Sequence, residues 1–260
     1  MISTSNPRNR EDWRTICKIA TERDEVLGAL QLVHDEYVRS GLSLPTDSGV
    51  RVTRYHLLNS TEVLVGLVDN QVACTLSLVR DSRFGLPMES IYHKEVNVRR
   101  RLGKSVAEVS CLADRRADAE RTLTVMFRVM ALVAQAATYR GVHELLIAIH
   151  PHHAKFYERF LGFEGIGDLK YYSTVRGNPA VAMALDLTRL HVTNPKAYKR
   201  LYGQPFSPRE LRERVVSLAL LEELSWLYLG SRQPSPVLAE VDSDFSESRG
   251  VALVPALAIA

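Results

Sequence analysis

Residues 144–163, ELLIAIHPHHAKFYERFLGF, decide the fold of this chain. The apolar run from Leu145 to Ile149 predicts a buried strand, and Pro151 suits the first turn of a helix but cannot continue a strand ladder. The residues that follow are amphipathic at helical spacing, and Gly162 supplies the left-handed residue that ends many helices. The stretch therefore predicts a strand, a helix and a second strand in direct succession.

Similar patterns extend outward from this unit in both directions. A helix is predicted from Thr21, as its cap, to about Ser40, and Asp69-Asn70-Gln71 joins two strands as a hairpin. The order indicates a mixed α/β fold. Strands are predicted at 15–20, 62–68, 72–79, 105–112, 165–175 and 180–187, and further helices from 87 and at 123–140, 195–202 and 208–229.

The composition is that of a globular protein with one domain and additions. The chain has 260 residues, of which 46% are hydrophobic and 24% are charged. The net charge of +3 is small, and no basic stripe with interleaved aromatic side chains appears, so no nucleic-acid partner is expected. We expect a catalytic core at 14–188, a helical extension at 189–230 and a flexible, Pro-, Ser- and acid-rich tail at 231–260.

Neither a metal centre nor a disulfide framework is expected. The cysteines Cys17, Cys74 and Cys111 are scattered, with no C-x-x-C spacing. The HPHH run at 150–153 lacks the ligand spacing of a zinc site. The first 14 residues contain no apolar signal segment, and no run approaches the roughly 20 apolar residues of a membrane span. A cytoplasmic protein is expected.

The strand–helix unit at 144–163, with Phe156, Tyr157 and the Gly162 stop, resembles the last βα unit of the GCN5-related acyltransferases. This resemblance implies the GNAT fold, an α/β fold with a mixed, splayed central sheet, here followed by a C-terminal helical extension. In that fold the fourth and fifth strands are parallel but diverge. The pantetheine arm of the acyl donor lies between them.

A larger set of segments resembles the FeeM-type N-acyl amino acid synthases, over roughly residues 18–187. The resemblance implies transfer of a long-chain acyl group from acyl carrier protein to the α-amine of an amino acid. The acyl-phosphopantetheine thioester is then a co-substrate, with no bound cofactor and only peripheral membrane contact through the lipid product. The segments are KIATERDE (18–25), HDEYVRSG (34–41), YHLL (55–58), TLSLVRDSRFGLPMESIY (75–92) and AEVSCLADRR (107–116).

The segment after the fourth predicted strand bears on the acyl donor. Coenzyme A-dependent relatives carry a glycine-rich loop here, whose amides bind a diphosphate. This chain reads CLADRRADAERTL, without glycine, so the backbone cannot approach a diphosphate closely. Arg115 and Arg116 suit the single phosphate of carrier-bound phosphopantetheine, and we place His150 and Phe156 beside the same arm. The alternative is a solvated arginine pair near Asp114.

Glu108 is the first candidate for the general base, because a carboxyl group inside an apolar strand needs a partner or a function. Burial raises the pKa of such a group, which can then accept the proton of the attacking amine, directly or through water. The alternative is a structural pair with an arginine. His56 is a second candidate base. The resemblance implies that Tyr157 is the acid for the departing thiolate; otherwise it is a core aromatic.

Substrate contacts are predicted at both ends of the acceptor. The resemblance makes Asp35 and Tyr37 candidates for amino-acid recognition, with a surface Asp and a core Tyr as the alternative. Arg54 or Arg83 offers a bidentate clamp for the substrate carboxylate. The basic run at 99–104 is either a solvated turn or a docking surface for the acidic carrier.

The backbone around the end of the fourth strand is predicted to hold the tetrahedral oxyanion through its N–H groups. The residues concerned are Cys111, Leu112 and Ala113. Cys111 as an acyl-enzyme nucleophile is a weaker alternative, because the sequence places no histidine beside it.

Three rival functions remain at this point. Acyl-homoserine-lactone synthases carry Glu-x-Ser-Arg on the same strand, but here Cys111 replaces the arginine. A coenzyme A-dependent acetyltransferase is opposed by the glycine-free loop. A non-catalytic module that binds an acyl group or its carrier is the third. The sequence leaves the amino acid, the acyl chain length and the oligomeric state open.

Overall fold

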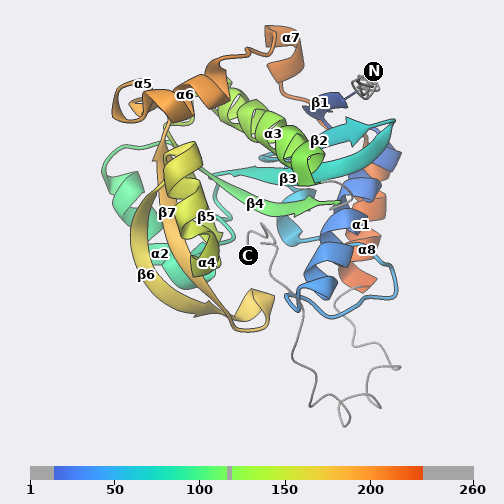
Figure 1. The fold of residues 1–260 in the computed structure, drawn as a ribbon. Coiled ribbons are helices and arrows are strands. Elements are labelled where there is room, and N and C mark those ends of the chain that lie inside the picture. Colours follow the sequence, from blue (N-terminus) through green and yellow to red (C-terminus); the bar gives the residue numbers. More distant parts are fainter. Residues whose placement is uncertain (1–14, 116–118, 231–260) are drawn as a thin grey trace, which may run out of the picture.

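The computed structural model describes residues 15–115 and 119–230, which form a seven-stranded sheet with helices on both faces (Figure 1). The strand order is β1-β2-β3-β4-β5-β7-β6, and every neighbouring pair is antiparallel except β4 and β5. The strands are β1 (Thr15–Ile19), β2 (Thr61–Val68), β3 (Gln71–Arg80), β4 (Val106–Asp114), β5 (Glu144–Ile149), β6 (Glu164–Tyr172) and β7 (Asn178–Asp186).

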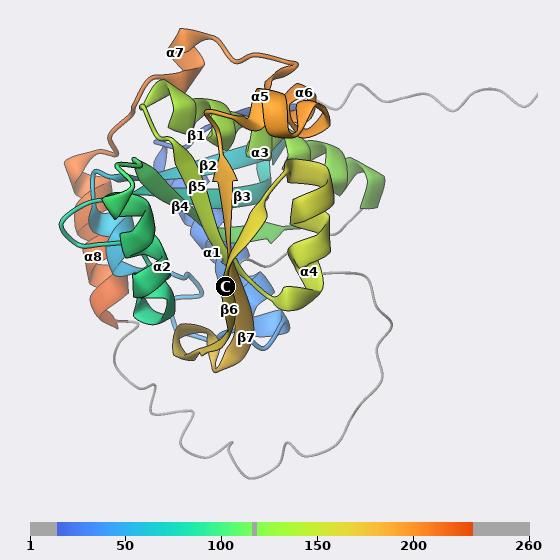
Figure 2. The same cartoon turned by 90° about the vertical axis from the view of Figure 1, so that its left-hand side faces the viewer.

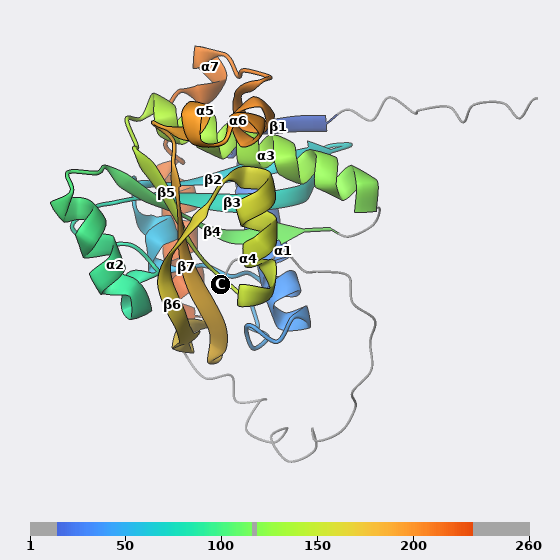
Figure 3. The same ribbon diagram turned by 60° about the vertical axis from the view of Figure 1, so that its left-hand side comes forward.

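Four helices cover the two faces of the sheet. Helix α3 (Ala119–Tyr139) packs on β1 to β4 from one side, and α1 (Arg23–Arg39) packs on β2 to β4 from the other (Figure 3). Around β7 and β6, α2 (Glu89–Arg101) shares the face of α1, whereas α4 (Pro151–Phe156) shares that of α3 (Figure 2). One π-helical turn, η2 (Tyr157–Leu161), continues α4 to Gly162, whose φ of 82° ends it as predicted.

The expected divergence of the fourth and fifth strands is present. Strands β4 and β5 pair only at Val106↔Glu144, Ala107↔Leu145 and Glu108↔Leu146. Beyond Glu108, β4 continues to Asp114 without pairing to β5. This geometry and the element order confirm the predicted GNAT-type mixed sheet.

The C-terminal helices wrap around one edge of the sheet. After α5 (Leu190–Thr193), helix α6 (Pro195–Tyr202) packs on α3, and α7 (Pro208–Leu211) follows. Helix α8 (Leu218–Gly230) lies beside α1 on the opposite face (Figure 1), where Arg23 forms an ion pair with Glu223.

A single helix over 208–229 was therefore a wrong prediction. Leu211 packs in the core on the α3 side, whereas Leu220 and Leu224 pack in the core on the α1 side. A straight helix cannot reach both faces, so the chain is extended at Arg212, whose ψ is 136°. Glu213, in the crossing, forms an ion pair with Arg80 at the end of β3.

Two smaller predictions were also wrong. Helix α1 begins at Arg23 with Glu22 as its cap residue, which makes no side-chain capping bond, so Thr21 is not the cap. The basic run begins inside the last turn of α2 instead of in a turn. Arg99 and Lys104 form ion pairs with the buried Glu144. These two cations are therefore engaged in holding α2 against the start of β5.

Residues 1–14 and the predicted tail at 231–260 lie outside the described residues. The predicted boundary at 188 stays a prediction, and the helices after it share the two cores of the sheet. Among the helices of the described ranges, none is long and apolar enough to cross a membrane.

Substitutions in the buried ion pair between Glu62 of β2 and Arg140 can test the packing at the C-terminal end of α3. Both side chains are almost fully buried. Replacing Arg140 with Leu leaves an unpaired buried carboxyl group, which should lower the free energy of unfolding by about 3 kcal/mol in urea titrations. The double variant E62L/R140L is the control and should recover most of that loss. A change below about 0.5 kcal/mol in R140L, as at ordinary surface sites, would contradict this account.

Candidate active site

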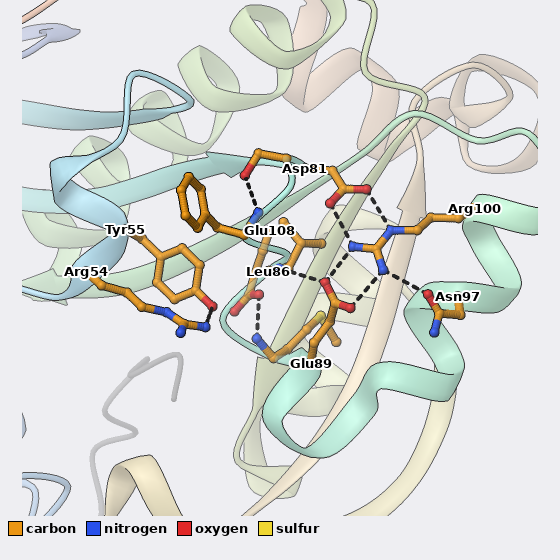
Figure 4. A network of polar contacts seen from close by, with 11 residues as sticks. Arg54, Tyr55, Asp81, Leu86, Glu89, Asn97, Arg100 and Glu108 are labelled. Atoms are coloured by element: carbon orange, nitrogen blue, oxygen red, sulfur yellow. Dashed lines mark hydrogen bonds and ion pairs between the residues drawn. The ribbon is translucent and has the colours of Figure 1, made fainter.

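Glu108 lies where β4 and β5 separate, in the last residue pair that the two strands share. Its side chain is fully buried, and its Oε2 accepts a hydrogen bond from the backbone N–H of Met88 at 2.7 Å (Figure 4). Oε1 has no hydrogen-bond partner among the described residues. The site thus contains a buried carboxyl group with one oxygen still able to bind a proton.

Burial sets the protonation of this carboxyl group. Removal from water raises the pKa of Glu108 to about 8, although the Met88 N–H favours the ionised form. The nearby carboxylate of Glu89 contributes to this increase in the pKa. The carboxyl group of the empty enzyme is therefore mostly protonated at pH 7, and a cation beside it favours ionisation.

An ion-pair network fixes the loop that presents Met88 to Glu108. Arg100 of α2 donates to both carboxylate oxygens of Asp81, at 2.8 and 2.7 Å, and also to Glu89 (Figure 4). Glu89 in turn accepts from the N–H of Leu86 at 2.7 Å. Arg100 thereby connects the two ends of the 81–89 segment. The network positions the backbone donor of Glu108 without contacting it.

A cavity of about 380 Å³ opens two residues beyond Glu108 along β4, between α1, the segment 51–55, η3 (Ser173–Val175) and α8. Glu108 itself is not among its lining residues. Ser110 and Cys111 of β4 both line it, although successive residues of a strand normally face opposite sides. A β-bulge explains this: Ser110 pairs with Ser77 and Ala113 with Thr75, so two β4 residues stand against one on β3. Cys111 has the positive φ of 54° at this bulge.

Two arginines line the cavity. The Arg51 guanidinium lies 4.8 Å from the ring centre of Tyr37 and donates to the Ser43 hydroxyl at 3.2 Å. Its Nε is buried and has no hydrogen-bond partner among the described residues. Arg54 stacks 4.8 Å from the ring centre of Tyr55 and donates to the Tyr55 hydroxyl at 2.7 Å. The cavity wall therefore contains two guanidinium groups held by aromatic rings and hydroxyls.

The predicted acceptor residues divide between the cavity and the surface. Tyr37 and Arg54 line the cavity. Asp35 is exposed and accepts from Nδ1 of His34 at 3.0 Å, and Nε2 of His34 accepts from the N–H of Thr46. Asp35 thus belongs to a contact that holds the loop after α1. Arg83 is exposed and stacks on Phe84, away from the cavity.

His56 caps the 3-10 turn η1 (Arg54–Leu57) from inside the protein. Its Nδ1 accepts from the N–H of Thr53 at 3.0 Å, so Nε2 carries the proton that faces the hydroxyl of Ser77 at 3.1 Å. Burial, with the charge of Arg51, lowers the pKa of His56 to about 4. The neutral ring is not among the cavity-lining residues. Its contacts are those of a structural residue.

On the donor side, Tyr157 of η2 is buried and its hydroxyl has no hydrogen-bond partner among the described residues. Burial raises the pKa of this hydroxyl, so it stays protonated. Leu112 packs in the core on the α3 side and Ala113 in the core on the α1 side. The backbone of β4 from Val109 onward lacks a β5 partner, which leaves N–H groups at the strand edge facing the divergence.

The predicted phosphate contacts lie farther along β4 and at the start of α4. Arg115 is exposed, and its guanidinium reaches Gln71 at 3.4 Å, while Arg116 lies outside the described residues. His150 is the cap residue of α4 and accepts from the N–H of His152 at 3.2 Å. Phe156 stacks with Phe127 of α3. None of these residues lines the cavity.

Arg51, Tyr172 and Tyr228 are among the cavity residues that sequence reasoning missed. Arg51 interrupts the apolar Val50–Val52 run, which was a usable signal for a charged side chain with a function. Nothing in the local sequence distinguishes Tyr172 or Tyr228 from ordinary core aromatics. No group of metal-ligating side chains occurs in the part of the chain that the structure describes.

Comparison with known proteins places this geometry in a family. Residues 28–186 match the model of "N-acyl amino acid synthase FeeM", more than half of the chain and all of β2 to β7. The chain belongs to the FeeM family of N-acyl amino acid synthases. It is accordingly an N-acyltransferase, as the sequence predicted. No curated protein matches the chain.

Solved structures agree with this FeeM-family assignment. FeeM, "an N-acyl amino acid synthase from uncultured soil microbes", is 27% identical with a TM-score of 0.61, covering 71% of this chain and 96% of its own. The acyl-homoserine-lactone synthase LasI is 16% identical (TM-score 0.54, 75% and 98% covered). BjaI, a coenzyme A-dependent acyl-homoserine-lactone synthase solved with SAM and isopentyl-CoA, is also 16% identical (TM-score 0.57, 82% and 99% covered). The latter two show the shared fold.

The raised pKa of Glu108 predicts a pH-dependent stability for this FeeM-family enzyme. Between pH 4.5 and about 8 the folded state keeps a proton that the unfolded state releases, so the free energy of unfolding falls as pH rises. The slope approaches about 1.4 kcal/mol per pH unit in the middle of this window. In Glu108→Gln this contribution is absent. Urea titrations of both proteins from pH 5 to 8 measure the difference, and parallel curves would contradict the shifted pKa.

Proposed function

We propose that the enzyme transfers a long-chain acyl group from acyl carrier protein to the α-amine of an amino acid by direct attack on the thioester. The observation that carries the proposal is the position of Glu108. Its unpartnered oxygen lies at the start of the β4–β5 divergence, and the next β4 residue on the same face, Ser110, lines the cavity that contains Arg51 and Arg54. In this proposal the base, the anion site and the donor channel are neighbours along β4.

The acceptor side would work as follows. The arginines hold the substrate carboxylate, which fixes the amino acid in the cavity. The substrate ammonium group near Glu108 lowers the pKa of that carboxyl group toward its ordinary value, because an opposite charge favours the ionised form. Glu108 then takes one proton from the nitrogen, directly or through water, and leaves a neutral amine that can attack.

The donor side completes the reaction. The amine nitrogen forms a bond to the thioester carbon, and the oxyanion accepts hydrogen bonds from backbone N–H groups of Cys111, Leu112 and Ala113 along the unpaired edge of β4. Collapse of the intermediate breaks the carbon–sulfur bond. Tyr157, whose buried hydroxyl stays protonated, donates its proton to the departing thiolate. The second proton that the nitrogen loses as the amide forms restores the Tyr157 hydroxyl through water. No acyl-enzyme forms, because burial raises the pKa of the Cys111 thiol.

The choice of acyl carrier protein as donor rests on the segment after β4. It has no glycine between Cys111 and Leu123, so no close cradle for a diphosphate forms there. Arg115, with Arg116, supplies charge for one phosphate. BjaI is described as coenzyme A-dependent, so the fold accepts either donor and the distinction lies in this segment. The soluble enzyme would meet its carrier in the cytoplasm.

A single reaction tests the class of activity. Purified enzyme is incubated with palmitoyl-carrier protein or palmitoyl-coenzyme A and a pool of all twenty amino acids, and products are identified by mass spectrometry. An N-acyl amino acid from the carrier-bound donor alone is the expected result. Product from palmitoyl-coenzyme A alone would overturn the proposal that Arg115 and Arg116 bind the single phosphate of the carrier-bound arm. If neither donor gives product, S-adenosylmethionine is added to test lactone synthesis.

Replacing Glu108 with Gln should lower kcat/KM at least tenfold, or about 1.4 kcal/mol of barrier, because the amine loses its proton acceptor. Binding of the carrier, measured by titration calorimetry, should stay unchanged. The exposed Glu222, changed to Gln, is the matched control. Wild-type turnover in Glu108→Gln would rule out Glu108 as the base. If the wild-type protein itself shows no turnover, a non-catalytic binding module is favoured instead.

A further inference from the structure

We propose that the acceptor is a dicarboxylic amino acid, an α-amino acid whose side chain carries a second negative charge. This inference rests on the proposed function of the cavity and concerns which amino acid it takes. The argument depends on the charges that the cavity contains before the substrate arrives.

The two cavity arginines have no carboxylate partner among the described residues. Within the described ranges, neither Arg51 nor Arg54 forms an ion pair with a carboxylate, and no Asp or Glu is among the described residues that line the cavity. Arginines that do pair with a carboxylate are Arg23, Arg39, Arg80, Arg99, Arg100 and Arg140. The cavity therefore carries two positive charges that no carboxylate of the described residues neutralises.

Both guanidinium groups are also held in place. Arg51 rests on Tyr37 and bonds Ser43, and Arg54 rests on Tyr55 and bonds its hydroxyl. Neither contact uses the whole donor fork, since each guanidinium has five N–H groups. The buried, unpartnered Nε of Arg51 in particular lacks an acceptor. Each arginine thus retains donors for an anion.

Counting charges in the reacting complex favours two carboxylates. The amine attacks as a neutral group, and Glu108 is neutral once it has taken the proton. The remaining charges are the two guanidinium groups and the carboxylates of the acceptor. A neutral amino acid leaves one cation uncompensated, a basic one leaves two, and a dicarboxylic one leaves none. Arg54 is exposed in the empty protein and Arg51 is half-buried, so a bound acceptor that covers them removes part of their water. A second carboxylate replaces that lost solvation with charge-assisted hydrogen bonds, so the wall favours the dicarboxylic acceptor.

The size of the acceptor side chain cannot explain a preference for an acid over its amide. Glutamate and glutamine have nearly the same shape, as do aspartate and asparagine, and the cavity of about 380 Å³ offers room for all four. The acid and its amide therefore form matched pairs of acceptors. A higher kcat/KM for the acid than for its amide therefore measures the effect of the second carboxylate alone.

The experiment compares kcat/KM for glutamate against glutamine and for aspartate against asparagine, with palmitoyl-carrier protein as donor. We expect at least one acid to exceed its amide by about tenfold or more, the worth of a charge-assisted hydrogen bond. In Arg54→Gln this acid-to-amide ratio should fall toward one, whereas Arg54→Lys should keep part of it. Arg83→Gln, an exposed arginine outside the cavity, is the matched control and should keep the wild-type ratio.

The outcomes separate this inference from the proposed function. Equal kcat/KM for acid and amide, with N-acyl product from both, would overturn the dicarboxylic acceptor and indicate that both arginines hold one carboxylate; N-acyl transfer would stand. An acid-to-amide ratio that survives Arg54→Gln and Arg51→Gln alike would overturn the assignment to these arginines. Absence of N-acyl product from every amino acid would overturn the proposed function, and this inference with it.

Discussion

The parallel pairing of β4 and β5 ends after three residue pairs, and the arrangement of the site depends on that limit. Up to Glu108 the two strands share a ladder, which fixes the carboxyl group within the sheet. Beyond it, the backbone of β4 has an unpaired edge, and a buried unpaired edge is costly unless a ligand binds there. The bulge at Cys111 adds to this by turning two successive side chains toward one cavity. In the proposed reaction, strand divergence thus creates the donor side, and the bulge shapes the acceptor side.

The electrostatics of the site follow from what the sheet buries. Among the described residues, Glu108 has one backbone donor and no cation partner, so the empty enzyme keeps it mostly neutral at pH 7. Arg100 pairs with Asp81 and Glu89, and Lys104 pairs with Glu144 and Asp186. In the proposed reaction the substrate therefore adjusts the protonation of Glu108 through its own ammonium group.

Sequence patterns predicted the elements whose neighbours along the chain dictate them. The 144–163 unit was predictable because proline, amphipathic spacing and glycine act locally, and the Asp69–Asn70 turn adopts the positive φ that such residues tolerate. The break at Arg212 was not predictable, because it arises from two cores on opposite faces of the sheet. Glu108 could be selected as a candidate because a lone carboxyl group in an apolar strand is unusual. Tyr172 and Tyr228 reach the cavity only through the fold, so their local sequence carries no signal.

Helix α8 supplies Tyr228 to the cavity, and this helix lies beyond residue 186, where the match to the family ends. In the proposed reaction, the reaction centre on β4 and one side of the acceptor cavity thus come from parts of the chain under different constraints. The strands proposed to hold the thioester must keep their pairing, whereas an appended helix can change its sequence without disturbing the sheet. A chain of this architecture can therefore acquire a new amino-acid preference by altering an addition to the fold while its acyl-transfer chemistry is inherited intact.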